Sequence, residues 1–286
     1  MKSLIFSFIL LVNCAALNAQ TLKITGDMPK IHFKPLIVLD TTFIRCQYRQ
    51  RIVTSTDSIT KRKTGAESTM LLQIGHKISK YADLKFFIAD SLSKVDIAEG
   101  VNVEKIVNRR LAVTRGASDL TIVKNYPENK ITNIDRVPFD YYMYTEYLVS
   151  PEWVIKKDTM TICGYLCKQA ITTFRGRNYK AWYAPEIAIS SGPWKFIGLP
   201  GLILKITDDK KEIDFECISI ENPHWIDRVY IEKSDYIKTT KTTFEGLKKK
   251  FMNNPAAFLQ NSPFIKGELL ENASQKRLYN PIELID

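Results

Sequence analysis

The chain has 286 residues, and its 41 Lys and Arg residues against 31 Asp and Glu residues give a formal net charge of +10. The positive residues are mostly lysines that are dispersed along the chain and alternate with acids, which is typical of a solvated surface and not of a nucleic-acid interface. With 45% hydrophobic residues, a chain of this length can bury the core of one large domain. We therefore expect no nucleic-acid partner, whereas attraction to an anionic membrane surface or to an acidic partner stays open.

The N-terminus has the features of a secretory signal. A lysine precedes an apolar run over residues 4–12, and small residues follow up to Ala19, directly before Gln20. The apolar run is shorter than the about 20 residues that span a bilayer, and no later stretch is long and uncharged enough to replace it. We predict cleavage near Ala19/Gln20 and a periplasmic or secreted protein with no transmembrane segment in the mature chain. A lipoprotein anchored at Cys14 is a disfavoured alternative, because Asn13 is a poor residue directly before a lipidation site.

The first part of the mature chain predicts a hairpin followed by a helix. Residues 31–53 are β-rich, a charged and hydroxyl-rich tip follows over residues 54–68, and residues 70–74 form the returning strand. Residues 79–98 place apolar side chains among Asp and Lys with a spacing that predicts one amphipathic helix. We expect this helix to cover one face of the sheet.

The central part of the chain predicts an antiparallel meander. From residue 120 to residue 220 the pattern is almost entirely strand, with turn signals at residues 126–129, 150–151, 163–164, 175–176 and 207–210. Further on, Thr242 and Glu245 form a capping box for a lysine-rich helix over residues 244–252, which ends before Pro255.

Together these elements predict a mainly β (α+β) fold, in which an antiparallel meander forms a curved sheet or incomplete barrel with a covering helix and a helical C-terminal extension. The corresponding organisation is a signal peptide at residues 1–19, a β domain at residues 20–232, and a C-terminal helix and tail at residues 233–286. The sequence has no internal repeat and no low-complexity linker, so a separate second domain has little support.

Four cysteines remain after signal cleavage, and an even number in an exported chain permits two disulfides. These residues are Cys46, Cys163, Cys167 and Cys217, which allow three pairings. The spacing of Cys163 and Cys167 favours a bond across a hairpin with a three-residue turn at Gly164. A redox-active role is the alternative, but thiol–disulfide enzymes usually place two residues between their cysteines at a helix N-terminus, whereas the surroundings here are strand-like.

The most distinctive segment is Gly198-Leu199-Pro200-Gly201-Leu202-Ile203. It follows a strand that ends at Pro185, which lacks a backbone donor, and a turn at residues 190–193. Glycines at such positions let the backbone turn sharply or approach another surface closely. We favour the interpretation that the segment is a rigid β corner that plugs the mouth of the sheet. A shaped loop that docks a partner or a ligand is the functional alternative.

This segment and its flanks resemble the GLPGLI family of exported Bacteroidetes proteins. The other matching segments follow one another at the family's spacing and are Trp153, Asp158-Thr159, Gly164-Tyr165-Leu166-Cys167-Lys168-Gln169-Ala170, Arg175-Gly176-Arg177-Asn178-Tyr179, Ala181-Trp182-Tyr183, Pro185-Glu186-Ile187, Gly192-Pro193-Trp194-Lys195-Phe196 and the tail Asn280-Pro281-Ile282-Glu283-Leu284. Ala184 and Ala188 depart from the threonine and the proline that are usual in the family. The resemblance implies export, and it implies no particular reaction because the family has no agreed biochemical activity.

Enzyme chemistry has little support in the sequence. His32, His76 and His224 lie far apart and share no metal-ligand spacing, so we predict no metal site and no cofactor. The chain has no Gly-x-Ser-x-Gly elbow and no phosphate-binding loop. The best polar constellation surrounds Glu186 and consists of Trp182, Tyr183, Arg175 and Arg177. We favour an ion pair between strands over a catalytic acid as the interpretation of Glu186, because paired charges also perturb acid strength for structural reasons.

Three functions from different classes are consistent with these features. The first is a non-catalytic carrier that holds a hydrophobic ligand or lipid in the periplasm, inside a barrel lined by Tyr141, Tyr142, Tyr144, Tyr147, Trp153, Trp182 and Trp194. Ordinary aromatic core packing is the alternative for these side chains. The second function is an accessory or docking partner of an outer-membrane β-barrel or transporter. The third is a secreted hydrolase, for which the sequence offers no site.

The residues that we expect to bind a ligand or partner come from the distinctive segment and the strand before it. They are Arg175, Arg177, Trp182, Tyr183, Glu186, Trp194, Gly198, Pro200 and Gly201.

Overall fold

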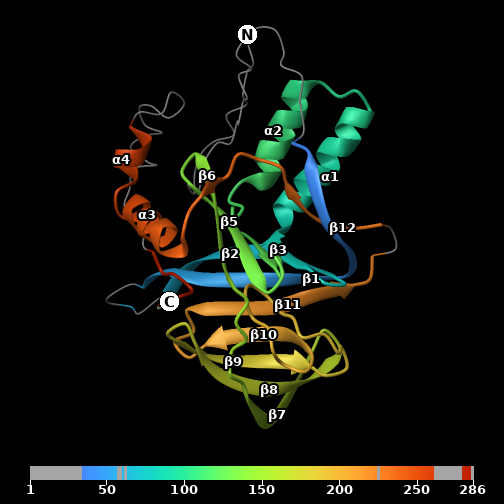
Figure 1. The fold of residues 1–286 in the computed structure, drawn as a ribbon, viewed down its shortest axis with the longest axis vertical. Helices are drawn as coiled ribbons and strands as arrows, with labels where there is room; N and C mark the ends of the chain where they lie inside the picture. Colours follow the sequence, from blue (N-terminus) through green and yellow to red (C-terminus); the bar gives the residue numbers. More distant parts are fainter. Residues whose placement is uncertain (1–33, 57–59, 61–62, 224–225, 261–278, 285–286) are drawn as a thin grey trace.

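The computed structural model describes residues 34–56, 60, 63–223, 226–260 and 279–284 (Figure 1). The predicted signal peptide, with Cys14 and the Ala19/Gln20 cleavage site, lies outside the described residues, and so do His32 and His224. Among the helices of the described part, none is long and apolar enough to cross a membrane.

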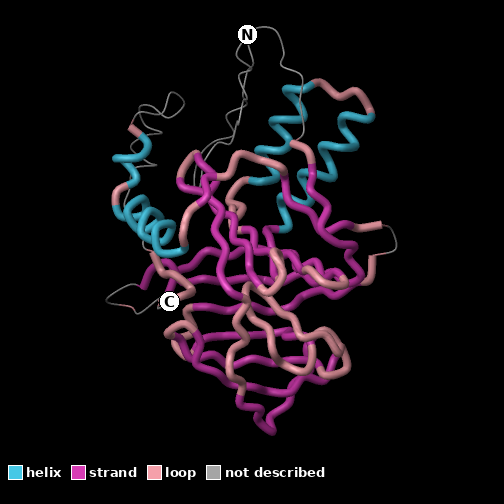
Figure 2. The backbone as a smooth tube through the Cα atoms, in the orientation of Figure 1, coloured by secondary structure: helices cyan, strands magenta, loops and turns pink. Residues whose placement is uncertain are grey.

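Strands are the main regular structure of the described chain, and the helices are confined to two places (Figure 2). The strands are β1 (Leu36–Thr56), β2 (Lys63–Gly75), β3 (Ser79–Asp83), β4 (Thr121–Lys124), β5 (Lys130–Val137), β6 (Asp140–Tyr147), β7 (Val154–Ile162), β8 (Tyr165–Phe174), β9 (Arg177–Ala184), β10 (Leu202–Asp208), β11 (Ile213–Glu221), β12 (Arg228–Glu232) and β13 (Ile237–Lys238). The helices are α1 (Leu84–Ala98), α2 (Val103–Thr114), α3 (Lys241–Asn253) and α4 (Pro255–Leu259).

The thirteen strands form one open sheet, which confirms the predicted mainly β, antiparallel architecture. The strand order is β13-β6-β5-β4-β3-β2-β1-β11-β10-β9-β8-β7, with β12 paired to β1 off this path. All strand pairs are antiparallel except β13 with β6. The meander is interrupted between β6 and β7, which lie near opposite ends of the order although only six residues separate them in the chain. It is interrupted again on either side of β12.

Alternating side chains explain why the chain forms strands in this region. Along β9, Arg177, Tyr179, Ala181 and Tyr183 are buried, whereas Asn178 and Lys180 between them are exposed. A period of two places successive side chains on opposite faces of a sheet, so one face of β9 faces the core and the other faces solvent.

A single hydrophobic cluster lies between the two parts of the sheet. It takes side chains from β1–β5 on one side and from β7–β11 on the other. Tyr81 on β3 and Phe215 on β11, for example, meet edge to face with ring centroids 6.5 Å apart. In Figure 1, β5 and β6 run steeply across the stack that β1 forms with β11 to β7. The sheet is therefore curled so that its two parts enclose one core.

The helical region after β2 differs from its prediction. Residues 79–83 form β3, which pairs with both β2 and β4, and only residues from Leu84 onward are helical. The switch occurs at Asp83, whose carboxylate accepts hydrogen bonds from the backbone N–H groups of Lys85 at 2.9 Å and Ser118 at 2.8 Å. An N-cap of this kind begins a helix, so pairing with two strands overrode the helical spacing of residues 79–83.

The sequence reading also missed α2, which packs beside α1 as a helical hairpin (Figure 1). Only Ile106 of this helix is buried, although Val103, Ile106, Val107 and Leu111 have the spacing of an amphipathic helix, so the signal was present in the sequence.

The C-terminal region is part of the same fold. The helix α3 begins earlier than predicted, because Thr240 and not Thr242 is its N-cap and accepts from the backbone N–H of Thr243 at 3.2 Å. Glu245, the expected partner in the capping box, accepts instead from the hydroxyl of Tyr279. Phe244 packs against Tyr144 on β6 with ring centroids 5.6 Å apart, so α3 covers the face of β5 and β6.

Candidate functional site

Residues 185–201, which connect β9 to β10, fold back into the core, and we call them the plug loop. Residues 191–196 of this loop are all buried. Its backbone is bonded to the strand that follows, since Leu202 donates to the carbonyl of Ile187 at 3.0 Å and Ile203 donates to that of Ser191 at 2.9 Å. The plug loop therefore occupies the space between the two parts of the sheet.

Phe196 is the centre of the aromatic packing in this space. Its side chain is fully buried, and its ring centroid lies 4.9 Å from that of Tyr179, 5.1 Å from Trp194 and 5.9 Å from Phe174. Rings at such separations and at tilted angles contribute beyond the area they bury. The interior around the plug loop is thus filled by the protein's own side chains.

Two side chains from the other part of the sheet hold the plug loop and the start of β10 in place. The ammonium of Lys124 on β4 donates to the carbonyl of Gly192 at 2.6 Å and to the hydroxyl of Ser191 at 3.3 Å. The hydroxyl of Tyr48 on β1 donates to the carbonyl of Ile203 at 2.7 Å. Burial lowers the pKa of Lys124 to about 7, because its hydrogen-bond partners are neutral and do not offset the loss of water around the charge.

The glycines of the distinctive segment are required by the backbone. Gly198 has φ +96° and Gly201 has φ +152°, which L side chains rarely adopt. A Cβ on Gly201 would lie 2.3 Å from the carbonyl oxygen of Ala184, which cannot move aside without shifting β9. Leu199 between them is buried, whereas Gly198 and Pro200 are exposed. The segment is therefore a tight corner with one buried and one exposed side.

Buried charges surround the turn between β8 and β9, where Arg175 and Arg177 lie. Arg175 forms ion pairs of 2.7 Å with both Glu146 and Glu283. Lys195, which follows Trp194 in the plug loop, contacts the same two carboxylates, and Lys241 at the start of α3 lies 2.5 Å from Glu283.

Arg177 holds the C-terminal tail against the sheet. Its guanidinium pairs with Asp208 at 2.9 Å and Glu212 at 3.1 Å. The same group donates to the side-chain oxygen of Asn280 at 2.6 Å and to the carbonyls of Pro281 at 2.9 Å and Ile282 at 3.1 Å. We call residues 280–284 with their partners Arg175, Arg177, Lys195 and Lys241 the tail clamp.

Glu283 is the carboxylate at which the tail clamp converges. Burial favours its neutral form, but the charges and hydrogen bonds of Lys195, Lys241 and Arg175 outweigh burial and lower the pKa of Glu283. The group is therefore ionised at neutral pH. A half-buried carboxylate among three cations serves to join the tail, the plug loop and α3.

The structure divides the predicted binding residues among three places. Arg175 and Arg177 belong to the tail clamp, Trp194 and Tyr183 are buried in the core, and Trp182 is half-buried. Glu186 is exposed, and the ion pairs found for the two arginines go to other carboxylates. The predicted ion pair around Glu186 is therefore wrong. Gly198, Pro200 and Gly201 form the corner described above.

Sequence reasoning missed three charged residues, of which two are buried and one, Glu146, is half-buried. Lys124, Lys195 and Glu146 are held by partners far away in the chain, so local spacing does not pair them. For Lys195 the sequence did give an indication of burial, because this residue is a lone charge between Trp194 and Phe196 in an apolar stretch.

The predicted bond between Cys163 and Cys167 is absent, since all four described cysteines are free. The hairpin has a two-residue turn and not a three-residue turn, because Ile162 pairs with Tyr165 and both turn residues have positive φ. That register places Cys167 opposite Met160. The thiol of Cys163 donates instead to the backbone carbonyl of Cys217 at 3.2 Å.

The outer edge of the sheet at β7 is exposed and partly apolar. Val154 is 55% exposed and Ile155 is 53% exposed, and no other strand of the described chain except β8 pairs with β7. The residues just before β7 touch the corner of the plug loop, since the indole N–H of Trp153 donates to the carbonyl of Ile197 at 2.8 Å. The corner and the β7 edge thus adjoin each other.

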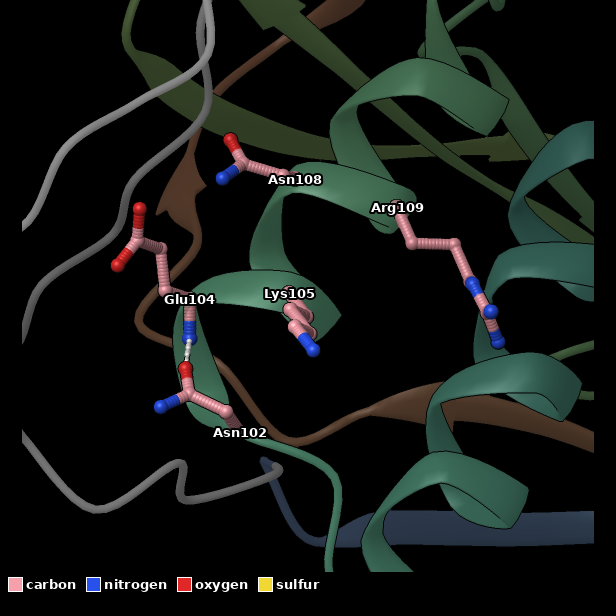
Figure 3. Close-up of a pocket in the computed structure, with 5 residues that line it drawn as sticks. All are labelled: Asn102, Glu104, Lys105, Asn108 and Arg109. Carbon is pink, nitrogen blue, oxygen red and sulfur yellow. Dashed lines mark hydrogen bonds between the residues drawn. The ribbon is translucent and has the colours of Figure 1, made fainter.

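A shallow open depression lies at the start of α2 (Figure 3). It is lined by Asn102, Glu104, Lys105, Asn108 and Arg109. Asn102 accepts from the backbone N–H of Glu104 at 2.8 Å and so caps the helix, and Arg109 pairs with Asp96 at 2.5 Å. Of the five lining side chains, those of Asn102 and Arg109 are thus engaged within the protein. Within the described residues, no group of three or more His, Cys, Asp and Glu side chains is arranged to hold a metal ion.

Comparison with protein-family models gives a match in the part of the chain that contains the plug loop. A family model described as "Protein of unknown function (Porph_ging)" matches residues 175–205, which run from the tail clamp through the plug loop into β10. A comparison with curated proteins gives no match. Two solved structures of PNGF-II, in space groups P21 and C2, are similar at 12% identity with a TM-score of 0.46. They cover 72% of this chain, and the chain spans about a third of their length, 33% and 32% respectively.

Proposed function

We propose that this chain is an exported, non-catalytic binding protein that docks a protein partner along the outer edge of β7 and the adjoining corner of the plug loop. The observation that carries the proposal is an exposed, partly apolar edge strand beside the exposed Gly198 and Pro200. Because the N-terminal sequence predicts export, the partner class that we propose is an outer-membrane protein.

An edge strand supports this mode of binding through its backbone. The outer N–H and C=O groups of an edge strand are free to pair with an extended segment of another chain, which adds to the sheet as a further strand. At the other end of the sheet, β13 already pairs with part of β6. Of the two ends of the sheet, β7 therefore offers the longer unpaired edge to a partner strand.

The charges of β7 favour an acidic partner segment over a second copy of this chain. Lys156 and Lys157 are both exposed on this strand. Two copies of β7 side by side would bring these lysines close together, and like charges across an interface disfavour such a pair. An extended segment that carries Asp or Glu would meet them with opposite charge.

The carrier hypothesis loses the observation on which it rested. The aromatic residues expected to line one cavity lie in different surroundings, with Trp194 in the core around Phe196 and Tyr144 against Phe244 of α3. Tyr147 is 73% exposed to solvent. These side chains support packing and not one shared cavity. We therefore favour docking of a partner over carriage of a ligand as the proposed function.

Photo-crosslinking in the native cell envelope tests the proposal. A photoreactive amino acid is placed at Ile155, at Pro200 and, as a control on the distant α2, at Lys105. We expect Ile155 and Pro200 to capture the same outer-membrane protein and Lys105 to capture none. Replacing Lys156 and Lys157 with Glu should abolish the capture, because the charge of the strand is reversed, whereas Lys105→Glu should not. Equal capture from all three positions, or a stoichiometric lipid bound to an uncrosslinked chain, would contradict the proposal.

A further inference from the structure

The curl of the sheet gathers cysteines from distant parts of the chain. Cys46 lies on β1, Cys217 on the neighbouring β11, Cys163 in the turn between β7 and β8, and Cys167 on β8. In the strand order, β10 and β9 separate β11 from β8. The β7–β8 turn with Cys163 therefore lies near Cys217 because the sheet is curled, and not because their strands pair.

The thiol of Cys217 lies between two other thiols. Both Cys46 and Cys163 lie near enough to Cys217 to influence the pKa of its thiol. The thiol of Cys163 also donates to the backbone carbonyl of Cys217 at 3.2 Å, while the thiol of Cys217 donates to the carbonyl of Ser219 at 3.4 Å. Cys167 instead donates to Tyr165 at 3.5 Å, so its thiol is turned toward its own strand.

Access distinguishes the two possible partners of Cys217. Cys163 is exposed, whereas Cys46 is fully buried and Cys217 is nearly so. Formation of a disulfide begins with attack on an oxidant, which must reach one of the two sulfurs. Only the pair of Cys163 with Cys217 offers such a sulfur without opening the core.

We propose that Cys163 and Cys217 form a disulfide in the exported protein, while Cys46 and Cys167 remain thiols. The oxidant is a disulfide-bearing oxidoreductase of the exporting compartment. Cys163 attacks this disulfide to form a mixed disulfide and releases one oxidant thiol, and Cys217 then attacks the sulfur of Cys163 and releases the other. The two protein thiols lose two protons and two electrons, and the oxidant is reduced to a dithiol.

The surroundings make the bond structural and not catalytic. Burial, followed by the contact with Cys217, raises the pKa of Cys163 to about 11, and the contact with Cys46, followed by burial, raises the pKa of Cys217. Thiols with raised pKa values are poor nucleophiles at neutral pH, so the pair does not serve as a fast thiol–disulfide exchange site. The bond instead ties the β7–β8 hairpin to β11 across a long loop, which a bond from Cys163 to Cys167 would not do.

Mass spectrometry of the mature chain from its own cells tests this inference. The protein is quenched in acid, alkylated without reduction and digested with chymotrypsin, which cleaves after Tyr165 and Leu166 and so separates Cys163 from Cys167. We expect alkylation at Cys46 and Cys167 only, and a linked pair of peptides that contain Cys163 and Cys217. Cys163→Ser should remove the linked pair, and Cys167→Ser should leave it.

Thermal unfolding provides a second readout that does not depend on digestion. A reductant should lower the unfolding temperature of the wild-type protein and leave that of Cys163→Ser unchanged. Alkylation of all four cysteines without reduction, or a bond of Cys217 to Cys46 or of Cys163 to Cys167, would overturn the inference.

Discussion

The plug loop and the β7 edge belong to the same part of the sheet but place their apolar side chains in opposite environments. Phe196 of the plug loop is fully buried among five aromatic rings, whereas Ile155 of β7 is 53% exposed beside two lysines. The buried residues are bonded to neighbouring strands and to Lys124. The difference indicates that the distinctive segment of this chain is mostly a structural element and that the surface beside it is available for binding.

Removal of the central ring should show the largest effect on stability. Phe196→Ala leaves a cavity among Tyr179, Trp194 and Phe174, so we expect a loss of about 3–5 kcal/mol in the free energy of unfolding. Leu166→Ala, at a side chain that is 61% exposed on β8, is the matched control and should change stability by less than about 0.5 kcal/mol. Urea denaturation of both variants measures the difference, and equal effects would remove the contrast between core and edge.

The tail clamp should show the next largest effect. Glu283→Gln leaves Lys195, Lys241 and Arg175 with one carboxylate fewer in a buried site, and we expect a loss of about 2–4 kcal/mol. Glu186→Gln changes an exposed carboxylate of the plug loop and should have little effect. Denaturation at pH 7 tests the pair. If Glu283→Gln were as stable as wild type, the clamp would not hold the tail.

The pH dependence of stability should show the free-energy cost of burying the amine of Lys124. Its pKa is about 7 when folded and about 10.4 in an unfolded chain. The unfolded state therefore binds more protons between these values, so stability rises with pH in this window and the cost of charging the buried amine is present in full below about pH 7.

Comparison with Lys124→Met isolates this contribution. Relative to that variant, the wild-type protein should gain up to about 1.4 kcal/mol per pH unit between pH 7 and pH 10. Urea denaturation of both proteins at pH 7, 8 and 9 measures the two slopes, because other groups contribute equally to each. Parallel slopes would show that the amine stays charged in the folded protein.

A substitution at the corner should cost less than removal of the core ring. Gly201→Ala places a methyl group against the backbone of Ala184 at a strained φ, so we expect a loss of about 1–3 kcal/mol. Gly246→Ala is the control, because it lies in α3 with nothing within 4 Å of its added Cβ and should gain about 0.5–1 kcal/mol from helix propensity. Thermal unfolding distinguishes the two directions.

The smallest effect on stability is expected at the β7 edge. Ile155→Ser should change the free energy of unfolding by less than about 0.5 kcal/mol, because the side chain is largely exposed. The same variant should lose capture of the outer-membrane partner by a photoreactive group at Pro200. A variant that unfolds easily, or that binds as wild type, would show that the edge is not a free docking surface.

Local patterns determined the strands and the turns of this protein. The alternation along β9, the turn at Cys163-Gly164, the end of β9 before Pro185 and the start of β10 after Gly201 all follow from neighbouring residues. Such features depend on a period of two and on the conformations open to Gly and Pro, which a sequence displays directly. The mainly β antiparallel class was therefore predictable.

The elements that the sequence reading missed or misassigned are those decided by distant residues. Residues 79–83 became a strand because β2 and β4 lie on both sides of it. The helix α2 is the exception, because its apolar spacing is local and was present in the sequence. Glu186 was expected to pair with the arginines because it lies near them in the chain, but Glu283 reaches Arg175 from the C-terminal tail.

By itself, then, the sequence determined the class of fold and the glycine corner, whereas export stays a prediction from it. The tertiary structure decided which charges meet, which cysteines face each other and which apolar residues are left exposed. The physical reason is that the curl of the sheet brings together residues far apart in the chain, such as Lys124 with Gly192 and Cys163 with Cys217. Strand propensity acts over a few neighbouring residues and carries no information about that curl.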